Sequence, residues 1–574
     1  MKTELFGVFG EYEGFSRHRS RQEFDVVVEG PSITVGVRDP HLGTPGRSAV
    51  ADTDSGSCLV WGEAFPPDAV DADSASWLLE AYRDRGRDAL SQLNGSFIAV
   101  IDTAEETIVA TDPIRSWECF YTDDHASRVF GTNAAAVART IDRPTVDRTS
   151  LREFMHVGMV FGEETLLSEL SRVPFDGYLT ATDVGGLERF VYDPQEFDYV
   201  SELARRLRRA IARRSGYPGS SGLLLSAGYD SRLLLSQVPS IEECFTVGHS
   251  DNPEIVRAGK LANQYGATHT VFEPDQRYLY AGPEKVEYAQ GIKESLHIHH
   301  AGYADGIDVD TIYHGLLCDT LIRGHFLERK AIDLFGKSLP LPPLESNPDP
   351  AAVLADRFGY VPEKSEAVVR HTNVGPDDPH SFVLESIREQ VETHAHRGVD
   401  VHTRLTCAGI ANQPSIPFRT HLADNYLESM LVTDVELLDW HLTTPPEHHN
   451  TRTFLEAIKR LDDDILRHTP PDRPFESQTV NAVQGFLRKK APFARSPRAW
   501  PDRFEMFDRY DLDQVLFPDQ PSIHELPPRH KLRVNDVTGW LEHCITSDVE
   551  FDELFAPSPS DGTGQLTRPV HGGR

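Results

Sequence analysis

The sequence predicts a mixed fold, with an α+β layered domain over residues 1–190 and an α/β domain built on a parallel sheet over residues 197–545. Three observations lead to this prediction. The 574 residues suffice for two or three domains, each with its own core. Short strand-like runs broken by Gly, Pro and Asp fill the first part, whereas strands alternate with helical patterns in the second. Residues 556–574, rich in Pro, Ser and Gly, are expected to form a disordered tail.

Composition narrows the environment and the partners of the chain. The net charge is −32, and only 11 of the 57 basic residues are Lys, a bias that suits a protein kept soluble at high salt and indicates a halophilic source. This acidic balance argues against nucleic-acid binding. No apolar run reaches 18 residues and no apolar signal segment opens the chain, so we expect a cytoplasmic protein without a membrane partner. The oligomeric state stays open, a homodimer included.

The first domain is expected to contain two sheets. Its strand-like runs are bounded by turn residues and cover residues 23–29, 32–37, 58–61, 96–101 and 107–110. Residues 75–83 and the run after Ala134 have helical character. The strongest basic run of the chain lies within residues 205–214, near the start of the second domain, and we expect it to decorate one face of a helix.

The stretch GLLLSAGYDS at residues 222–231 organises the second domain. A short buried strand runs into a tight turn that opens a helix, which directs main-chain N–H groups and the positive end of the helix dipole at one spot. Ser226, Gly228 and Ser231 allow an anion to approach closely, and Asp230 can hold a divalent cation beside it. A magnesium-bound polyphosphate is the simplest ligand with these properties, although the same pattern also occurs as plain strand–turn–helix structure.

Further strands are expected at residues 243–247, 268–272 and 311–313, with a helix over residues 254–264. This alternation predicts a parallel sheet that binds ligands at the C-terminal ends of its strands. Asp319 follows the last of these strands and Asp230 follows a neighbouring one. The two carboxylates are therefore predicted to share a Mg²⁺ ion.

The loop at residues 222–231 resembles the pyrophosphate loop of the asparagine synthetase family, usually Ser-Gly-Gly-Leu/Ile-Asp-Ser, with Ala227 and Tyr229 as departures. The run HGLLCDTLIRGHF at residues 314–326 is similar to that family's Ser-Gly-Glu/Asp-Gly-Ala-Asp-Glu-Leu-Phe-Gly-Gly-Tyr. The resemblance implies an adenine-nucleotide α-hydrolase-like (PP-loop) domain with a helical C-terminal part. It also implies ATP as a substrate, held in part by Leu224, Val247 and Gly315.

Three segments of the first domain resemble the class II glutaminase domain (Ntn-hydrolase-like, αββα) of glutamine-using asparagine synthetases. FGVFG at residues 6–10 is similar to its opening Cys-Gly-Ile-Phe-Gly, WGE at residues 61–63 to its Asn-Gly-Glu, and residues 93–121 to its second half. Phe6 stands where that family has its nucleophilic Cys, and Trp61 where it has an Asn that helps to stabilise the oxyanion. The domain is therefore expected not to hydrolyse glutamine.

The resemblance implies that ATP and a carboxylate, aspartate or an analogue, form an acyl-adenylate and pyrophosphate, after which ammonia or an amine displaces AMP. Arg473 lies nearest to the position of the family's basic residue that neutralises charge in this step, with Lys459, Lys489 and Lys490 as competitors. Leu316 replaces an acidic residue of the family. Two alternatives therefore stay open: an ATP-dependent amide ligase acting on another acid, and a non-enzymatic nucleotide-binding or regulatory protein.

Overall fold

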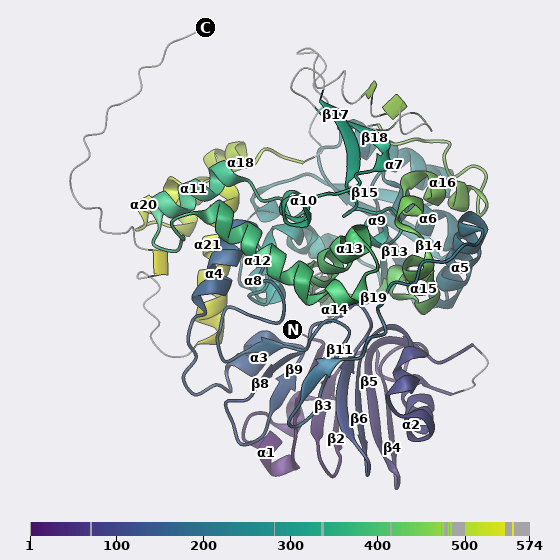
Figure 1. The fold of residues 1–574 in the computed structure, drawn as a ribbon, viewed down its shortest axis with the longest axis vertical. Coiled ribbons are helices and arrows are strands. Elements are labelled where there is room, and N and C mark those ends of the chain that lie inside the picture. Colours follow the sequence, from purple (N-terminus) through teal and green to yellow (C-terminus); the bar gives the residue numbers. More distant parts are fainter. Residues whose placement is uncertain are drawn as a thin grey trace.

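The described chain contains two antiparallel sheets, one parallel sheet and a two-stranded hairpin, together with many helices (Figure 1). The structure therefore has the mixed α+β and α/β class that the sequence predicts. The predicted tail at residues 556–574, as well as Lys489 and Lys490, lies outside the described residues. This computed structural model describes residues 2–68, 72–279, 282–333, 338–413, 416–471, 473, 475, 480, 481, 483, 484, 500–545, 554 and 555.

The N-terminal part contains two antiparallel sheets of six strands each. The first has the order β10-β8-β9-β1-β3-β2, with the bounds β1 Glu4–Val8, β2 Val26–Glu29, β3 Thr34–Arg38, β8 Phe120–Thr122, β9 Val129–Gly131 and β10 Ser171–Arg172. The second has the order β12-β11-β7-β6-β5-β4, with the bounds β4 Ala49–Thr53, β5 Gly56–Phe65, β6 Asn94–Thr103, β7 Thr107–Thr111, β11 Gly177–Leu179 and β12 Val184–Gly186. The strands predicted for this domain all lie in these two sheets.

Side-chain alternation along the strands produces the layers of this part. In β5, Leu59 and Trp61 join the core that both sheets share, whereas Cys58 and Val60 pack with helix α2 (Ser74–Arg85) on the other face. Helices also pack into the shared core beside the first sheet, namely α1 Tyr12–Ser16, α3 Ala134–Ala138, α4 Arg148–Val157 and the late helix α21 Pro528–Cys544. Residues more than 500 positions apart in sequence therefore complete one core.

The second part is built on a parallel sheet with the order β15-β14-β13-β16-β19. Every neighbouring pair of its strands is parallel, and the bounds are β13 Ser221–Leu224, β14 Ile241–Val247, β15 Thr268–Phe272, β16 Thr311–His314 and β19 Leu427–Met430. The first four strands are those predicted from the sequence. The edge strand β19 was not predicted.

Helices cover both faces of the parallel sheet, and each face has its own core. Leu223 of β13 lies in the larger core, whereas Leu224 lies in the other core with Leu422 and Tyr426. The helices α5 Tyr199–Arg214, α6 Tyr229–Gln237, α7 Pro253–Gln264, α15 Val435–Thr443 and α16 Thr451–Lys459 contribute to the larger core. The remaining elements are α8 Pro283–Ala289, α9 Cys318–Leu321, α10 Pro350–Arg357, α11 Pro362–His371, α12 Pro379–Thr393, α13 Val401–Ala411, α14 Ile416–Asn425, α18 Arg503–Tyr510, α19 Leu512–Leu516, α20 Pro521–His524, and the hairpin β17 Arg329–Asp333 with β18 Ser338–Leu344. Among the residues described, none of the helices combines the length and the apolar character that crossing a membrane requires.

A buried arginine joins the two parts of the chain. Arg214, the last residue of α5, donates from Nε to Glu63 of β5 at 2.8 Å and from Nη1 to Asp434 at 2.7 Å. Its side chain is 2% exposed, and those of Glu63 and Asp434 are 1% and 0% exposed. The carbonyl oxygen of Arg214 accepts a hydrogen bond from the Tyr313 hydroxyl at 2.7 Å, which ties this contact to β16.

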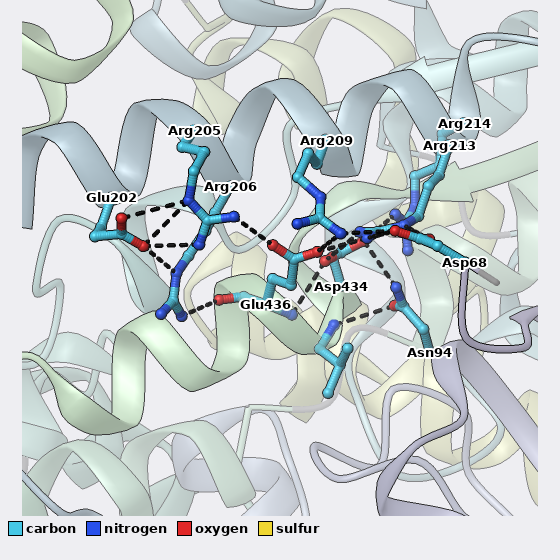
Figure 2. A network of polar contacts seen from close by, with 11 residues as sticks. Asp68, Asn94, Glu202, Arg205, Arg206, Arg209, Arg213, Arg214, Asp434 and Glu436 are labelled. Carbon is cyan, nitrogen blue, oxygen red and sulfur yellow. Dashed lines mark hydrogen bonds and ion pairs between the residues drawn. The ribbon is translucent and has the colours of Figure 1, made fainter.

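The rest of the basic run extends the contact toward solvent (Figure 2). Arg213 donates to Asp434 at 3.0 Å and to Asp68 at 3.0 Å, and Arg209 reaches Asp68 at 2.6 Å. Asn94 at the start of β6 donates to Asp434 at 3.1 Å. The predicted helix face is thus only part of the arrangement, because the C-terminal end of the run is buried against carboxylates from both parts of the chain.

Replacing one buried partner of Arg214 should destabilise the whole chain. Glu63→Gln leaves the guanidinium with one carboxylate fewer in a water-excluded place, and we expect a loss of about 3 kcal/mol in the free energy of unfolding. Urea unfolding followed by circular dichroism measures this loss. Arg205→Gln is the control, because Arg205 is 46% exposed and pairs at the surface with Glu202, so its removal should change the stability by less than about 0.5 kcal/mol. Equal effects of the two substitutions would contradict a special role of the buried pair.

The stability that the Asp434–arginine contact contributes should also decrease at low pH. Burial alone would raise the pKa of Asp434, but the guanidinium groups of Arg214 and Arg213 hold that pKa below its ordinary value. A depressed folded-state pKa stabilises the fold above the unfolded-state value of about 3.9, and the stabilisation disappears as the pH falls through the folded-state value. The Tm difference between the wild type and Asp434→Asn should therefore be constant between pH 5 and 8 and shrink below about pH 4. A difference that is unchanged at pH 3 would contradict this assignment.

Candidate functional site

A cavity of about 250 Å³ lies at the C-terminal ends of the central strands of the parallel sheet. Its walls come from β13, β14, β16 and the first turn of α6, as expected where parallel strands end side by side. The structure brings most of the predicted binding residues together in this wall: Leu224, Ser226, Asp230, Ser231, Val247 and Gly315.

The predicted anion loop links β13 to α6 and is held by its own serines. The Ser231 hydroxyl accepts from the Ser226 main-chain N–H at 3.2 Å, and the Gly228 N–H donates to the Ser226 hydroxyl at 3.1 Å. Gly228 caps α6, so the N–H groups of the first helical turn have no partner within the helix. The loop therefore places the N-terminal end of a helix, with two hydroxyls beside it, next to the cavity.

A second cavity of about 180 Å³ adjoins the first and shares Ala227 and Glu254 with it. Gly228 lines this smaller cavity, and two arginines, Arg323 and Arg473, line it as well. Arg473 is the residue predicted to neutralise the charge that develops during catalysis, and its side chain is exposed. Two guanidinium groups beside a helix N-terminus form a strongly positive place that suits a phosphate chain.

Asp230 lies in the first turn of α6, and only one of its two carboxylate oxygens has a hydrogen-bond partner among the described residues. Its Oδ2 accepts from Arg323 Nη2 at 2.6 Å, while its Oδ1 is buried and has no hydrogen-bond partner among the described residues. Burial raises the pKa of Asp230 to about 6; Arg323 opposes this shift and the nearby Asp319 adds to it. A buried carboxylate oxygen without a donor is a ready ligand for a hard cation.

The second predicted metal ligand is less enclosed. Asp319 lies in the first turn of α9, is 48% exposed, and its Oδ2 is 3.8 Å from His325 Nδ1. It is close enough to act on the charge of Asp230, yet it lines neither of the two cavities. Within the described chain, no group of three or more His, Cys, Asp and Glu side chains is arranged as a metal site. A cation here would therefore need oxygen ligands from a bound phosphate besides the two carboxylates.

Arg323 is a residue of this site that the sequence analysis did not single out. It lies two residues beyond the end of α9 and stands where the motif that residues 314–326 resemble has the first Gly of its Gly-Gly pair. That replacement was the available signal. An arginine in this position reaches both Asp230 and the smaller cavity, whereas a glycine would leave both without it.

The far end of the larger cavity is connected to the N-terminal part. His314 accepts from the Leu316 N–H at Nδ1 and therefore donates from Nε2 to Glu428 at 2.7 Å. Burial alone would raise the pKa of Glu428, but Arg419 holds it well below its ordinary range through a two-pronged contact at 2.9 and 2.8 Å. Arg419 also donates to the Ser96 hydroxyl at 2.7 Å. One wall of the cavity is therefore positioned by β6 of the second sheet.

Aromatic side chains fill the place where the N-terminal resemblance would locate a glutaminase site. Phe6 in β1 is fully buried, and its ring meets that of Phe15 edge-on at 5.8 Å. Trp61 is 3% exposed and meets Trp117 edge-on at 4.9 Å. A phenyl ring and an indole offer neither a nucleophile nor an amide donor for an oxyanion.

The contact between the two strand ends should be sensitive to a single methyl group. A Cβ added to Gly315 would lie 2.7 Å from Asp230 Cβ and 3.1 Å from its carbonyl carbon, so Gly315→Ala must displace the start of α6. We expect inorganic pyrophosphate binding, measured by isothermal titration calorimetry with Mg²⁺, to weaken at least tenfold. Gly216→Ala is the control, because a Cβ there meets no atom within 4 Å and should leave binding unchanged. Equal binding by both variants would contradict the described packing.

No family model and no curated protein matches this chain. Solved structures that match include "the allosteric regulatory enzyme of purine biosynthesis", at 13% identity over 49% of this chain and 82% of that chain, with a TM-score of 0.20. Another is glutamine phosphoribosylpyrophosphate amidotransferase from B. subtilis, at 13% identity over 48% of this chain and 76% of that chain, with a TM-score of 0.19. Similarity at this level supports no conclusion about this chain, so the functional reasoning rests on the geometry of the site.

Proposed function

We propose that this protein is an ATP-dependent carbon–nitrogen ligase that releases AMP and pyrophosphate. The observation that carries the proposal is the pair of adjoining cavities at the N-terminus of α6, one largely apolar between strand ends and one flanked by Arg323 and Arg473. A nucleoside fits the first kind of place and a polyphosphate the second. Their shared wall is the loop after β13, where the bond between the α- and β-phosphates of ATP would then lie.

Residues around the two cavities would bind the nucleotide and its leaving group in this reaction. The ends of β13 and β14, with Leu224 and Val247, would contact the adenine, and Ser226, Gly228 and Ser231 would hold the departing pyrophosphate through hydroxyl and main-chain donors. The substrate carboxylate attacks the α-phosphorus, the bond to the β-phosphate breaks, and an acyl-adenylate and pyrophosphate result. Ammonia or an amine then attacks the acyl carbon, loses a proton and displaces AMP, which forms the amide.

A magnesium ion fits the acidic side of this site. Two features support this fit: the buried Oδ1 of Asp230 has no hydrogen-bond donor among the described residues, and the carboxylate of Asp319 lies nearby. In the proposal these two residues hold Mg²⁺, which offsets negative charge as pyrophosphate leaves. Arg473, which lines the smaller cavity, would neutralise the same charge.

The nitrogen donor and the acid are proposed from the departures in the sequence. Because Phe6 is a buried ring, the N-terminal part is proposed to act as a scaffold without glutaminase activity, and the nitrogen would come from ammonia or a substrate amine. Leu316 lines the cavity beside His314, where the resembled family has an acid. Aspartate or an analogue remains the first acid to test, and another carboxylate is the alternative.

A second candidate function is nucleotide binding without catalysis. The specific observation in its favour is the ion pair between Arg323 and Asp230, which occupies one oxygen of the carboxylate that catalysis would need for the metal. A regulatory protein that binds ATP could retain such a pair throughout its working cycle.

Exchange of labelled pyrophosphate into ATP separates these functions. With Mg²⁺ and the correct acid, the wild type should incorporate label, and Asp230→Asn should lower the rate at least a hundredfold because the metal loses a charged ligand. Exchange with aspartate identifies an asparagine synthetase-like enzyme, and exchange with another acid identifies a different ligase. No exchange with any acid of a broad panel, despite ATP binding, would leave the regulatory function. Arg388→Gln, a change in a surface pair on α12, should exchange as the wild type does.

A further inference from the structure

Arg323 occupies the boundary between the carboxylate of Asp230 and the smaller cavity. Its Nη2 donates to Asp230 Oδ2 at 2.6 Å, and its side chain is 13% exposed. Its Nε is buried and has no hydrogen-bond partner within the described part of the chain. The guanidinium lies over the ring of Phe454 at 5.8 Å and lines the cavity that also contains Arg473. Only part of the donor capacity of Arg323 is therefore used.

The two possible cations of Asp230 exclude one another. Arg323 already takes Oδ2, and Oδ1 lies within the same carboxylate, so a divalent ion bound there would lie within a few ångströms of the guanidinium. Like charges at such a distance in a poorly hydrated place repel each other strongly. A metal ion alone should therefore bind weakly as long as Arg323 stays on the carboxylate.

A phosphate chain removes this conflict. A guanidinium binds phosphate oxygens through two parallel N–H donors, and Arg323 already lines the cavity that suits such a chain. When pyrophosphate occupies that cavity, Arg323 gains an anion to pair with and Asp230 becomes free for the metal. The metal and the phosphate would then enter together, each making room for the other.

We propose that Arg323 exchanges partners during binding: it neutralises Asp230 in the ligand-free protein and pairs with the β- and γ-phosphates of the nucleotide once a divalent cation takes its place. This inference rests on the proposed nucleotide site and adds a rule for its loading. The metal enters only with a polyphosphate, and Arg323 is a positioning residue that controls this coupling.

Two binding measurements on the full chain test the proposal. Mn²⁺ binding without nucleotide is followed by electron paramagnetic resonance, and inorganic pyrophosphate binding with Mg²⁺ by calorimetry. Arg323→Gln should bind Mn²⁺ alone at least tenfold more tightly than the wild type and pyrophosphate at least tenfold more weakly. Arg473→Gln is the matched control, because it lines the same cavity. It should weaken pyrophosphate binding and leave Mn²⁺ binding within about threefold of the wild type.

Two further variants separate the charge of Arg323 from its hydrogen bonding and test whether its effect requires Asp230. Arg323→Lys keeps the charge without the two-pronged donor, so it should keep Mn²⁺ binding weak while pyrophosphate binding falls. In the double variant Arg323→Gln/Asp230→Asn, the gain in Mn²⁺ affinity should disappear. If Arg323→Gln leaves Mn²⁺ affinity unchanged, or affects pyrophosphate no more than a surface substitution does, the exchange of partners is wrong. If the wild type itself binds no pyrophosphate with Mg²⁺, the nucleotide site is wrong instead.

Discussion

The fold depends on one buried guanidinium, that of Arg214, which two carboxylates from different parts of the chain hold in place. Glu63 belongs to the antiparallel layers, Asp434 precedes α15, and the carbonyl of Arg214 accepts from Tyr313 of the parallel sheet. Removing two carboxylates and a guanidinium from water has a large electrostatic cost that only close mutual pairing offsets. Charge pairing as well as apolar packing therefore holds the two parts in this relative position.

The candidate site inherits its geometry from this arrangement. Once the parallel strands are registered, the ends of β13 and β16 bring Gly315 against Asp230. The carboxylate is then buried and requires a cation, which Arg323 provides in this structure. The larger cavity is bounded at the other end by His314, which Glu428 and Arg419 orient, and Arg419 is itself bonded to Ser96 of the N-terminal part. A part of the chain with an aromatic core in place of a nucleophile thus still shapes the wall where a substrate would lie.

The elements that were predicted correctly carry their signal in local sequence. Runs such as residues 58–61 and 243–247 are mostly apolar and lie next to turn residues, and strand formation there depends on neighbours close in the chain. Ser226, Asp230 and Gly315, which were predicted to bind the nucleotide, lie in the wall of one cavity. Ser226 and Asp230 were singled out because the turn between a buried strand and a helix can bind an anion, and Gly315 was singled out through the family resemblance.

What the sequence did not reveal depends on distant partners. Strand β19 contains Glu428 and Ser429, which look unsuited to a buried strand until Arg419 and Glu63 are seen to bind them. The burial of Arg214 and the pairing of Arg323 likewise depend on residues far away in sequence. The burial of a charged side chain can be predicted only when its oppositely charged partner is known. The pattern of a single strand or helix does not contain that information.

The contact of Trp117 with Trp61 and Arg419, at the boundary between the two parts, should affect the fluorescence of the protein. Trp117 lies against Trp61 at 4.9 Å on one side, and the Arg419 guanidinium, which comes from the other part of the chain, lies over its ring at 4.1 Å. The emission of an indole responds to the electric field of a cation held at its face. Any loosening of the two parts would withdraw that cation, so the intrinsic fluorescence of the protein carries a direct readout of how firmly its halves are joined.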